Sequence, residues 1–130
     1  MKNIDRFNEC TARLFAELYA SFPMPCDISY FEWLDQDALE TDKDELAFCE
    51  ATVRWLEDAG YIHVGVRDVE GAYGIVLTAK GMEMMKVVPQ SVKTKKSVGD
   101  ALVGAVGEGM RVSAAQIVSR AFTEVFKLFS

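Results

Sequence analysis

The chain has little of the chemistry from which metal sites and disulfide frameworks are built. It contains one histidine, His63, and three cysteines, Cys10, Cys26 and Cys49, in 130 residues. The cysteines are odd in number and show no paired spacing, so we expect no disulfide framework. Zinc sites need close pairs of cysteine or histidine, and these residues are spread singly along the chain. The sequence therefore predicts no metal site and no cofactor.

The usual signs of catalysis are also missing. His63 falls on a predicted strand, on the face opposite its apolar neighbours, where a surface position is the simpler interpretation. No glycine-rich phosphate loop follows a predicted strand. We therefore expect a protein that is not an enzyme, with no catalytic residues.

Long apolar runs are absent. No stretch of about 18 uncharged apolar residues occurs, so we expect no transmembrane span. The opening residues 1–9 lack the apolar run of a signal peptide. These two absences predict a cytoplasmic location.

Positive charge is scarce. Lysine and arginine number 14 against 20 aspartates and glutamates, which gives a net charge of −6. Residues 1–90 hold 8 basic and 17 acidic residues (net −9), whereas residues 91–130 hold 6 and 3 (net +3). The net negative charge of the whole chain disfavours generic nucleic-acid binding. The acidic stretch 27–50 is either a solvated loop and helix start or a docking face for a basic partner.

Hydrophobic residues make up 50% of the chain, enough for the core of one modest domain or of a small domain with an appendage. Apolar spacing of three and four predicts a first helix over 3–21 and a third helix over 42–59. Between them we expect a short strand near 26–28 and a second helix over 29–36. Thr41 is expected to cap the third helix and Gly60 to end it.

The next stretch predicts a β-hairpin. Residues 61–69 alternate between apolar and polar, with Ile62, Val64 and Val66 on one face, and a second strand is expected over 73–78. Thr78 is placed to cap a fourth helix, which Pro89 would terminate.

Two short sequence motifs in this region resemble those of a known family. Leu56-Glu-Asp-Ala-Gly-Tyr-Ile62 at the end of the third helix and Leu77-Thr-Ala-Lys-Gly81 after the hairpin are similar to phrases of the winged-helix superfamily. The resemblance implies an α+β, mainly α fold with a two-stranded wing over about 3–88. We accordingly predict a winged-helix domain at 1–88, a linker at 89–97 and a C-terminal helical segment at 98–130.

Winged-helix proteins of the DNA-binding kind use the third helix and the wing tip for contact. In this chain the resemblance implies only three basic residues as nucleic-acid contacts: Lys43, Arg54 and Arg67. The third helix also carries the acidic residues Glu50 and Glu57. Carboxylates repel a phosphate backbone, so the third helix is unsuited to ordinary DNA reading.

The third helix instead carries aromatic residues away from its core stripe. Phe48 and Trp55 lie nearly opposite Cys49 and Val53 on a helical wheel. Exposed aromatic residues beside small ones are typical of a contact surface.

The tail is strongly apolar. Residues 98–129 are rich in large apolar side chains, and the burial of eleven of them involves on the order of 15–30 kcal/mol of transfer free energy. Three arrangements would bury them: packing on the same chain, a helical interface between subunits, or a helix lying in a membrane surface. We expect the tail helix, from its own chain or a swapped one, to cover Phe48 and Trp55. The partner-interface residues predicted on this helix are Val118, Phe122, Val125, Phe126 and Phe129.

Together these patterns favour a non-enzymatic module for protein–protein interaction or assembly. We expect a homodimer and a further protein partner whose identity the sequence does not specify. The alternatives are a DNA-binding transcriptional regulator of winged-helix type, which the charge disfavours, and a protein attached to a membrane surface through its C-terminal helix.

Overall fold

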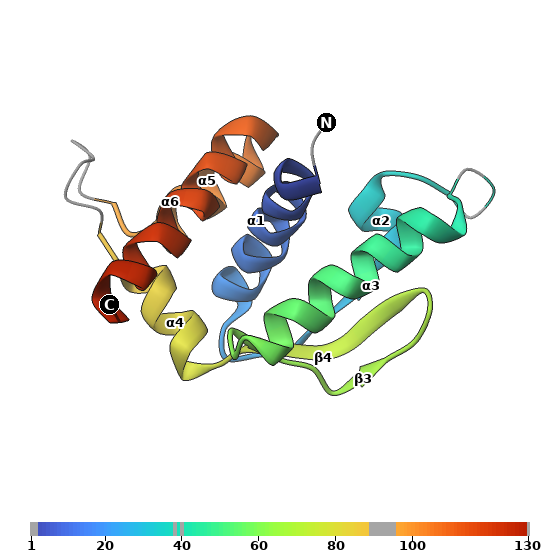
Figure 1. The fold of residues 1–130 in the computed structure, drawn as a ribbon, viewed down its shortest axis with the longest axis horizontal. Helices are drawn as coiled ribbons and strands as arrows, with labels where there is room; N and C mark the ends of the chain where they lie inside the picture. The colour runs from blue at the N-terminus through green and yellow to red at the C-terminus, as the bar shows by residue number, and fades with distance from the viewer. Residues whose placement is uncertain (1–2, 38, 40, 89–95, 130) are drawn as a thin grey trace.

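The computed structural model describes residues 3–37, 39, 41–88 and 96–129, with side chains described up to residue 124 in the last helix (Figure 1). The elements in chain order are α1 (Asn3–Ser21), β1 (Cys26–Ser29), α2 (Tyr30–Leu34), α3 (Lys43–Asp58), β2 (Ile62–His63), β3 (Val66–Arg67), β4 (Gly71–Leu77), α4 (Ala79–Lys86), α5 (Val98–Gly107) and α6 (Arg111–Phe129). The expected α+β, mainly helical class is confirmed.

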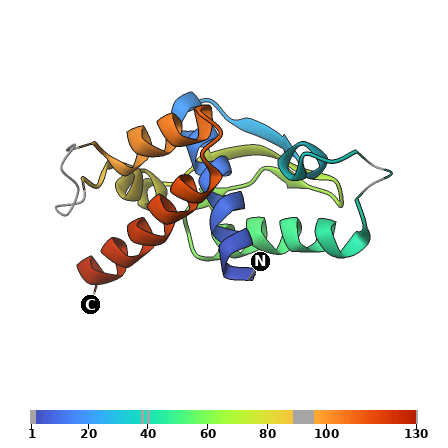
Figure 2. The same cartoon turned by 90° about the horizontal axis from the view of Figure 1, so that it is seen from above.

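Helix α1 runs through the middle of the molecule. Its apolar residues recur every three or four positions, and the stripe is fully buried at Leu14, Phe15 and Leu18. Helices α5 and α6 pack against one side of α1, and α3 and strand β4 contact it elsewhere. Figures 1 and 2 both place the first turns of α1 between α6 and α3.

The sheet is small and is built around β4. Strand β1 pairs antiparallel with one edge of β4, and β2 and β3 pair antiparallel with the other. The predicted hairpin is therefore present, but its first strand is interrupted between His63 and Val66. The predicted common face of this strand is also wrong at its outer end, because Val66 is 64% exposed whereas Ile62 is buried.

Helix α3 begins and ends at residues whose backbone geometry explains its length. Asp42, rather than the expected Thr41, is the N-cap, and its side chain accepts a hydrogen bond from the Glu45 N–H at 2.9 Å. Gly60 follows the helix with a φ of +90°, a left-handed conformation that favours glycine. Buried Cys49, Val53 and Leu56 hold α3 on the core.

Thr78 joins the hairpin to α4 as the sequence predicts. Its hydroxyl accepts a hydrogen bond from the Gly81 N–H at 3.1 Å and donates to the Gly60 carbonyl at 2.5 Å. One side chain therefore caps the start of α4 and binds the backbone just after α3.

The C-terminal segment folds back onto the rest of the chain. It forms two helices separated by Gly109, which has a φ of +73°. Val98, Leu102 and Val118 are buried in the same core cluster as the residues of α1. A backbone hydrogen bond from the Val98 N–H to the Val87 carbonyl, 2.8 Å, ties the start of α5 to the end of α4.

Candidate functional site

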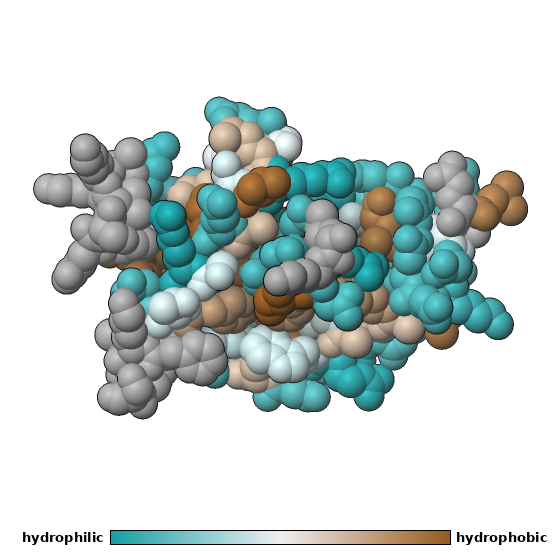
Figure 3. Space-filling model, turned by 45° about the horizontal axis from the view of Figure 1, so that its top comes forward, coloured by the Kyte–Doolittle hydropathy of each residue, from teal (hydrophilic) through white to brown (hydrophobic). Residues whose placement is uncertain are grey.

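An apolar groove lies where α1, α3 and α6 meet. It encloses about 470 Å³, and its lining residues are Ile4, Phe7 and Asn8 of α1, Trp55 of α3, and Ser119, Phe122 and Thr123 of α6. Figure 3 shows apolar and weakly polar side chains gathered in the middle of this side of the molecule, with hydrophilic ones around them. Its lining is mainly apolar, and its polar members are Asn8, Ser119 and Thr123.

A cluster of aromatic rings forms the wall of this groove. The rings of Trp55 and Phe7 pack edge to face with their centroids 5.3 Å apart. The rings of Trp55 and Phe122 pack in the same way at 6.1 Å. Phe122 in turn packs on Tyr61 at 5.3 Å and on Phe15 at 6.4 Å. Edge-to-face packing of this kind stabilises each ring pair by about 0.5–1.5 kcal/mol beyond area burial. The rings therefore hold the three helices in fixed positions.

Two large apolar residues of the groove remain open to solvent. Trp55 is 48% exposed although its ring contacts three other aromatic residues, Phe7, Tyr61 and Phe122. Ile4 is 60% exposed on the first turn of α1. Phe7 and Phe122 lie beside them, half-buried. Isolated exposed apolar residues are common on protein surfaces, but a concave group of aromatic and aliphatic residues is typical of a contact site.

Charged side chains of both signs lie on α1 and α3 and beside the ring of Tyr61. The Arg6 guanidinium lies over the Phe48 ring at 4.1 Å from its centroid, and Arg54 pairs with Glu50 at 3.2 Å. Lys80 Nζ lies 4.5 Å from the centroid of the Tyr61 ring. An arginine over an aromatic face covers apolar surface while its charge stays in contact with water.

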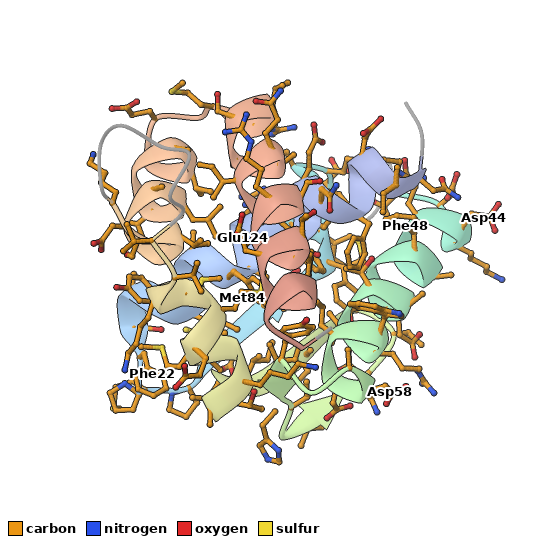
Figure 4. All side chains as sticks on the ribbon, turned by 60° about the vertical axis from the view of Figure 1, so that its left-hand side comes forward. Phe22, Asp44, Phe48, Asp58, Met84 and Glu124 are labelled. Atoms are coloured by element: carbon orange, nitrogen blue, oxygen red, sulfur yellow. The ribbon has the colours of Figure 1, made fainter. Side chains whose placement is uncertain are left out.

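The predicted interface residues fall in different places. Trp55 and Phe122 line the groove together, and Phe122 of the same chain covers one side of Trp55. Phe48 is half-buried beneath Arg6, near the start of α1, as Figure 4 shows, and it does not line the groove. Val118 is fully buried in the core. The side chains of the remaining predicted residues lie outside the described part: Val125, Phe126 and Phe129.

The three residues predicted for nucleic-acid contact do not form a cationic surface. Arg67 Nη1 lies 2.6 Å from Glu57 Oε1, and Arg54 is paired with Glu50. Lys43 is exposed in the first turn of α3, between Asp42 and Asp44. Each of these cations therefore has a carboxylate beside it in space or in sequence.

A second hollow lies on another side of α1, and sequence reasoning missed it. It encloses about 350 Å³ between α1, α2 and α6, and Cys10, Arg13, Trp33 and Arg111 are among its lining residues. Asp35 links two of its walls, because its carboxylate pairs with both Arg13 and Arg111. The Trp33 indole N–H donates to the Cys10 carbonyl at 3.0 Å.

Cys10 of α1 lines this second hollow and is half-buried. Cys49, 39 positions further along the chain on α3, is fully buried. The hydrogen bond from Cys49 lowers the pKa of Cys10, and nearby Arg6 and Arg13 lower it further against the opposing effect of burial. The same hydrogen bond and burial raise the pKa of Cys49.

His63 is exposed on β2. Among the residues that the structure describes, no group of three or more histidine, cysteine, aspartate or glutamate side chains is arranged to hold a metal ion. Within the same residues, none of the helices combines the length and the apolar character needed to cross a membrane. Comparisons of the chain with known protein families, characterised proteins and solved structures gave no match.

Proposed function

We propose that the protein is a non-enzymatic assembly module that forms a homodimer through the groove between α1, α3 and α6. The observation that carries the proposal is the exposure of Trp55 within an otherwise packed ring cluster. A tryptophan that is held rigidly and half exposed loses little conformational freedom on binding. Tryptophan is also among the residues most often found to dominate binding energy at interfaces.

The shape of the groove supports a second copy of the chain as the occupant. A two-fold contact places the same patch on both sides of an interface, so each copy must offer both a projection and a hollow. Ile4 and Trp55 project from the walls that also enclose the hollow.

The order of the elements supports a winged-helix architecture beneath this function. Helix, strand, helix, helix and hairpin follow one another from α1 to β4, and β1 adds a third strand at the edge of β4. That order favours DNA binding as the second candidate function. The carboxylates beside Arg54, Arg67 and Lys43 weigh against it, because they would repel the phosphate backbone.

A matched pair of substitutions tests the proposed dimer. Ile4→Glu adds a charge to the groove at a side chain that is already 60% exposed, so the fold loses little packing. Val66→Glu adds the same charge at a residue that is 64% exposed on the hairpin, away from the groove. The mass in solution is measured by light scattering for both variants and for the unchanged chain.

We expect the unchanged chain and Val66→Glu to have the mass of a dimer and Ile4→Glu that of a monomer. Equal masses for all three proteins would contradict the proposed interface. Binding to duplex DNA that weakens steeply with salt, together with a monomeric mass, would favour the regulator instead. Co-sedimentation with anionic vesicles by a monomeric chain would favour membrane attachment.

A further inference from the structure

The groove between α1, α3 and α6 contains one polar side chain that packing does not explain. Asn8 lines the groove and is only 9% exposed. Within the described part of the chain, its carboxamide makes no hydrogen bond to another protein group. A buried amide without a partner lowers stability, because it gives up hydrogen bonds to water and gains none. A ligand that bonds to Asn8 would remove this cost.

Asn8 differs from the two polar groups that are sealed in the core. The hydroxyls of Thr11 and Tyr30 also lack partners among the described residues, but both residues are 0% exposed and neither lines the groove. Asn8 keeps some exposure and lines a hollow of about 470 Å³. Small-molecule sites are hollows of about 300–1,000 Å³ with a few polar groups in an apolar lining. The groove matches this description.

The rest of the lining determines the character of the ligand. The rings of Phe7, Trp55 and Phe122 form the walls, and such rings favour a flat aromatic compound. None of the described lining residues is charged, so a charged ligand would lose its hydration without gaining an opposite charge. The carboxamide of Asn8 offers both an acceptor and donors, which complement a donor beside an acceptor on the ligand.

We propose that the groove binds a neutral, flat aromatic compound whose amide-like edge hydrogen-bonds to Asn8. The ring system of the compound lies against the exposed face of Trp55. A compound bound in this way fills the hollow that the second copy of the chain requires, so it also dissociates the dimer. This last consequence rests on the proposed homodimer, whereas the ligand site itself does not.

The test uses two related probes and the unchanged chain. The first probe is 2-quinolone, a neutral bicyclic lactam with an N–H beside its carbonyl. The second is 1-methyl-2-quinolone, which keeps the rings and the carbonyl but has no donor. Both are titrated to millimolar concentration, and binding is followed by NMR through the indole N–H signals of the two tryptophans. The spectrum of Trp55→Phe assigns these signals.

We expect 2-quinolone to shift the Trp55 signal and to leave the Trp33 signal in place. Trp33 is an internal control, because it does not line the groove and its indole N–H donates to the Cys10 carbonyl at 3.0 Å. The methylated probe should bind about tenfold more weakly, because it leaves the Asn8 acceptor without a partner. A Trp55 signal that 2-quinolone does not shift, as for a groove that holds only water, would overturn the proposal. Equal affinities for the two probes would overturn it as well.

A matched pair of variants tests Asn8 from the side of the protein. Asn8→Leu replaces the amide by an apolar side chain of similar size and removes no hydrogen bond to the described residues. It should bind 2-quinolone about tenfold more weakly than the unchanged chain. Ser119→Ala removes an exposed hydroxyl from the same groove and should leave the affinity unchanged. Equal losses in the two variants would contradict the role of Asn8. The two probes decide the question if Asn8→Leu does not fold.

Sedimentation of the unchanged chain with and without 2-quinolone separates the ligand site from the homodimer. If both proposals hold, the average mass falls toward that of one chain as the probe is added. A Trp55 shift in a chain that is monomeric throughout supports the ligand site and contradicts the homodimer. A dimer whose Trp55 signal the probe does not move contradicts the ligand site alone. A dimeric mass that persists while the Trp55 signal shifts would overturn the competition between ligand and second copy.

Discussion

Neighbouring residues of α1 line two different hollows. Arg6 covers the Phe48 ring at 4.1 Å and also lies on the wall of the hollow that contains Cys10. Phe7, the next residue, faces the groove and packs on Trp55. Neighbouring residues on a helix point about 100° apart, so one turn of α1 contributes to both hollows.

Val118 and Val112 make a matched pair on α6, because the first is fully buried and the second is 67% exposed. Val118→Ala leaves a cavity in the core, and we expect it to lower the free energy of unfolding by about 2 kcal/mol. Val112→Ala should change it by less than about 0.5 kcal/mol. Urea unfolding followed by circular dichroism measures both. Equal losses would mean that α6 does not pack on α1 in solution.

Tyr30 is fully buried, and its hydroxyl has no hydrogen-bond partner among the described residues. Burial raises the pKa of Tyr30 above its usual value. A pKa that is higher in the folded chain gives stability that is intact below the unfolded pKa of about 10 and is lost as pH rises beyond it. We therefore expect Tyr30→Phe to lose less stability at alkaline pH than the unchanged chain.

At neutral pH we expect Tyr30→Phe to be at least as stable as the unchanged chain, because the substitution removes a buried hydroxyl without a partner. Thermal unfolding at pH 7 and again above pH 10 measures both effects. A variant less stable by more than about 1 kcal/mol at pH 7 would indicate that the hydroxyl has a bonding partner in solution.

At the scale of elements, features set by local physics were predictable from the sequence. The apolar stripes of α1 and α3 follow from helical spacing alone, and Gly60 and Thr78 mark helix ends because few other residues suit those backbone conformations. The break in the hairpin was not predictable. Val66 carries on the alternating pattern, but the strand extends past the core there, and only the packed structure shows where the core ends.

The same distinction applies to the two hollows. Trp55 and Phe122 could be selected as contact residues from their positions on helical wheels, and both line the groove. The position of Cys10 in the second hollow depends on how α2 and α6 lie against α1, which no local pattern encodes. The burial of Val118 likewise depends on where α6 folds back, after the turn at Gly109.

The start of α3 gives a prediction at the same scale. Asp42 accepts the Glu45 N–H, so Asp42→Ala should lower the free energy of unfolding by about 1 kcal/mol. Within the described residues, the hydroxyl that Thr41→Ala removes bonds only to Gln36 and Asp37 of the preceding loop, and we expect a smaller loss. Chemical denaturation of the two variants decides between them. A larger loss for Thr41→Ala would favour the capping box expected from the sequence.

Charge governs behaviour at the scale of the whole molecule. Each chain carries a net charge of −6, so two chains repel each other at long range, and in the proposed dimer the apolar contact between the grooves outweighs this repulsion. Added salt screens the repulsion and leaves the apolar contact intact. We expect the dimer dissociation constant to fall at least about twofold between low and high salt, as sedimentation velocity can measure. A dissociation constant that rises with salt would mean that ion pairs, not apolar contacts, hold the dimer.

Sedimentation equilibrium of the unchanged chain over a wide concentration range tests the central claim most directly. The account predicts that the average mass rises with concentration from the 14.5 kDa of one chain toward twice that value, and then stops rising. A mass that stays at 14.5 kDa across the whole range would contradict it. In that case the exposed face of Trp55 would not be a contact between copies of this chain.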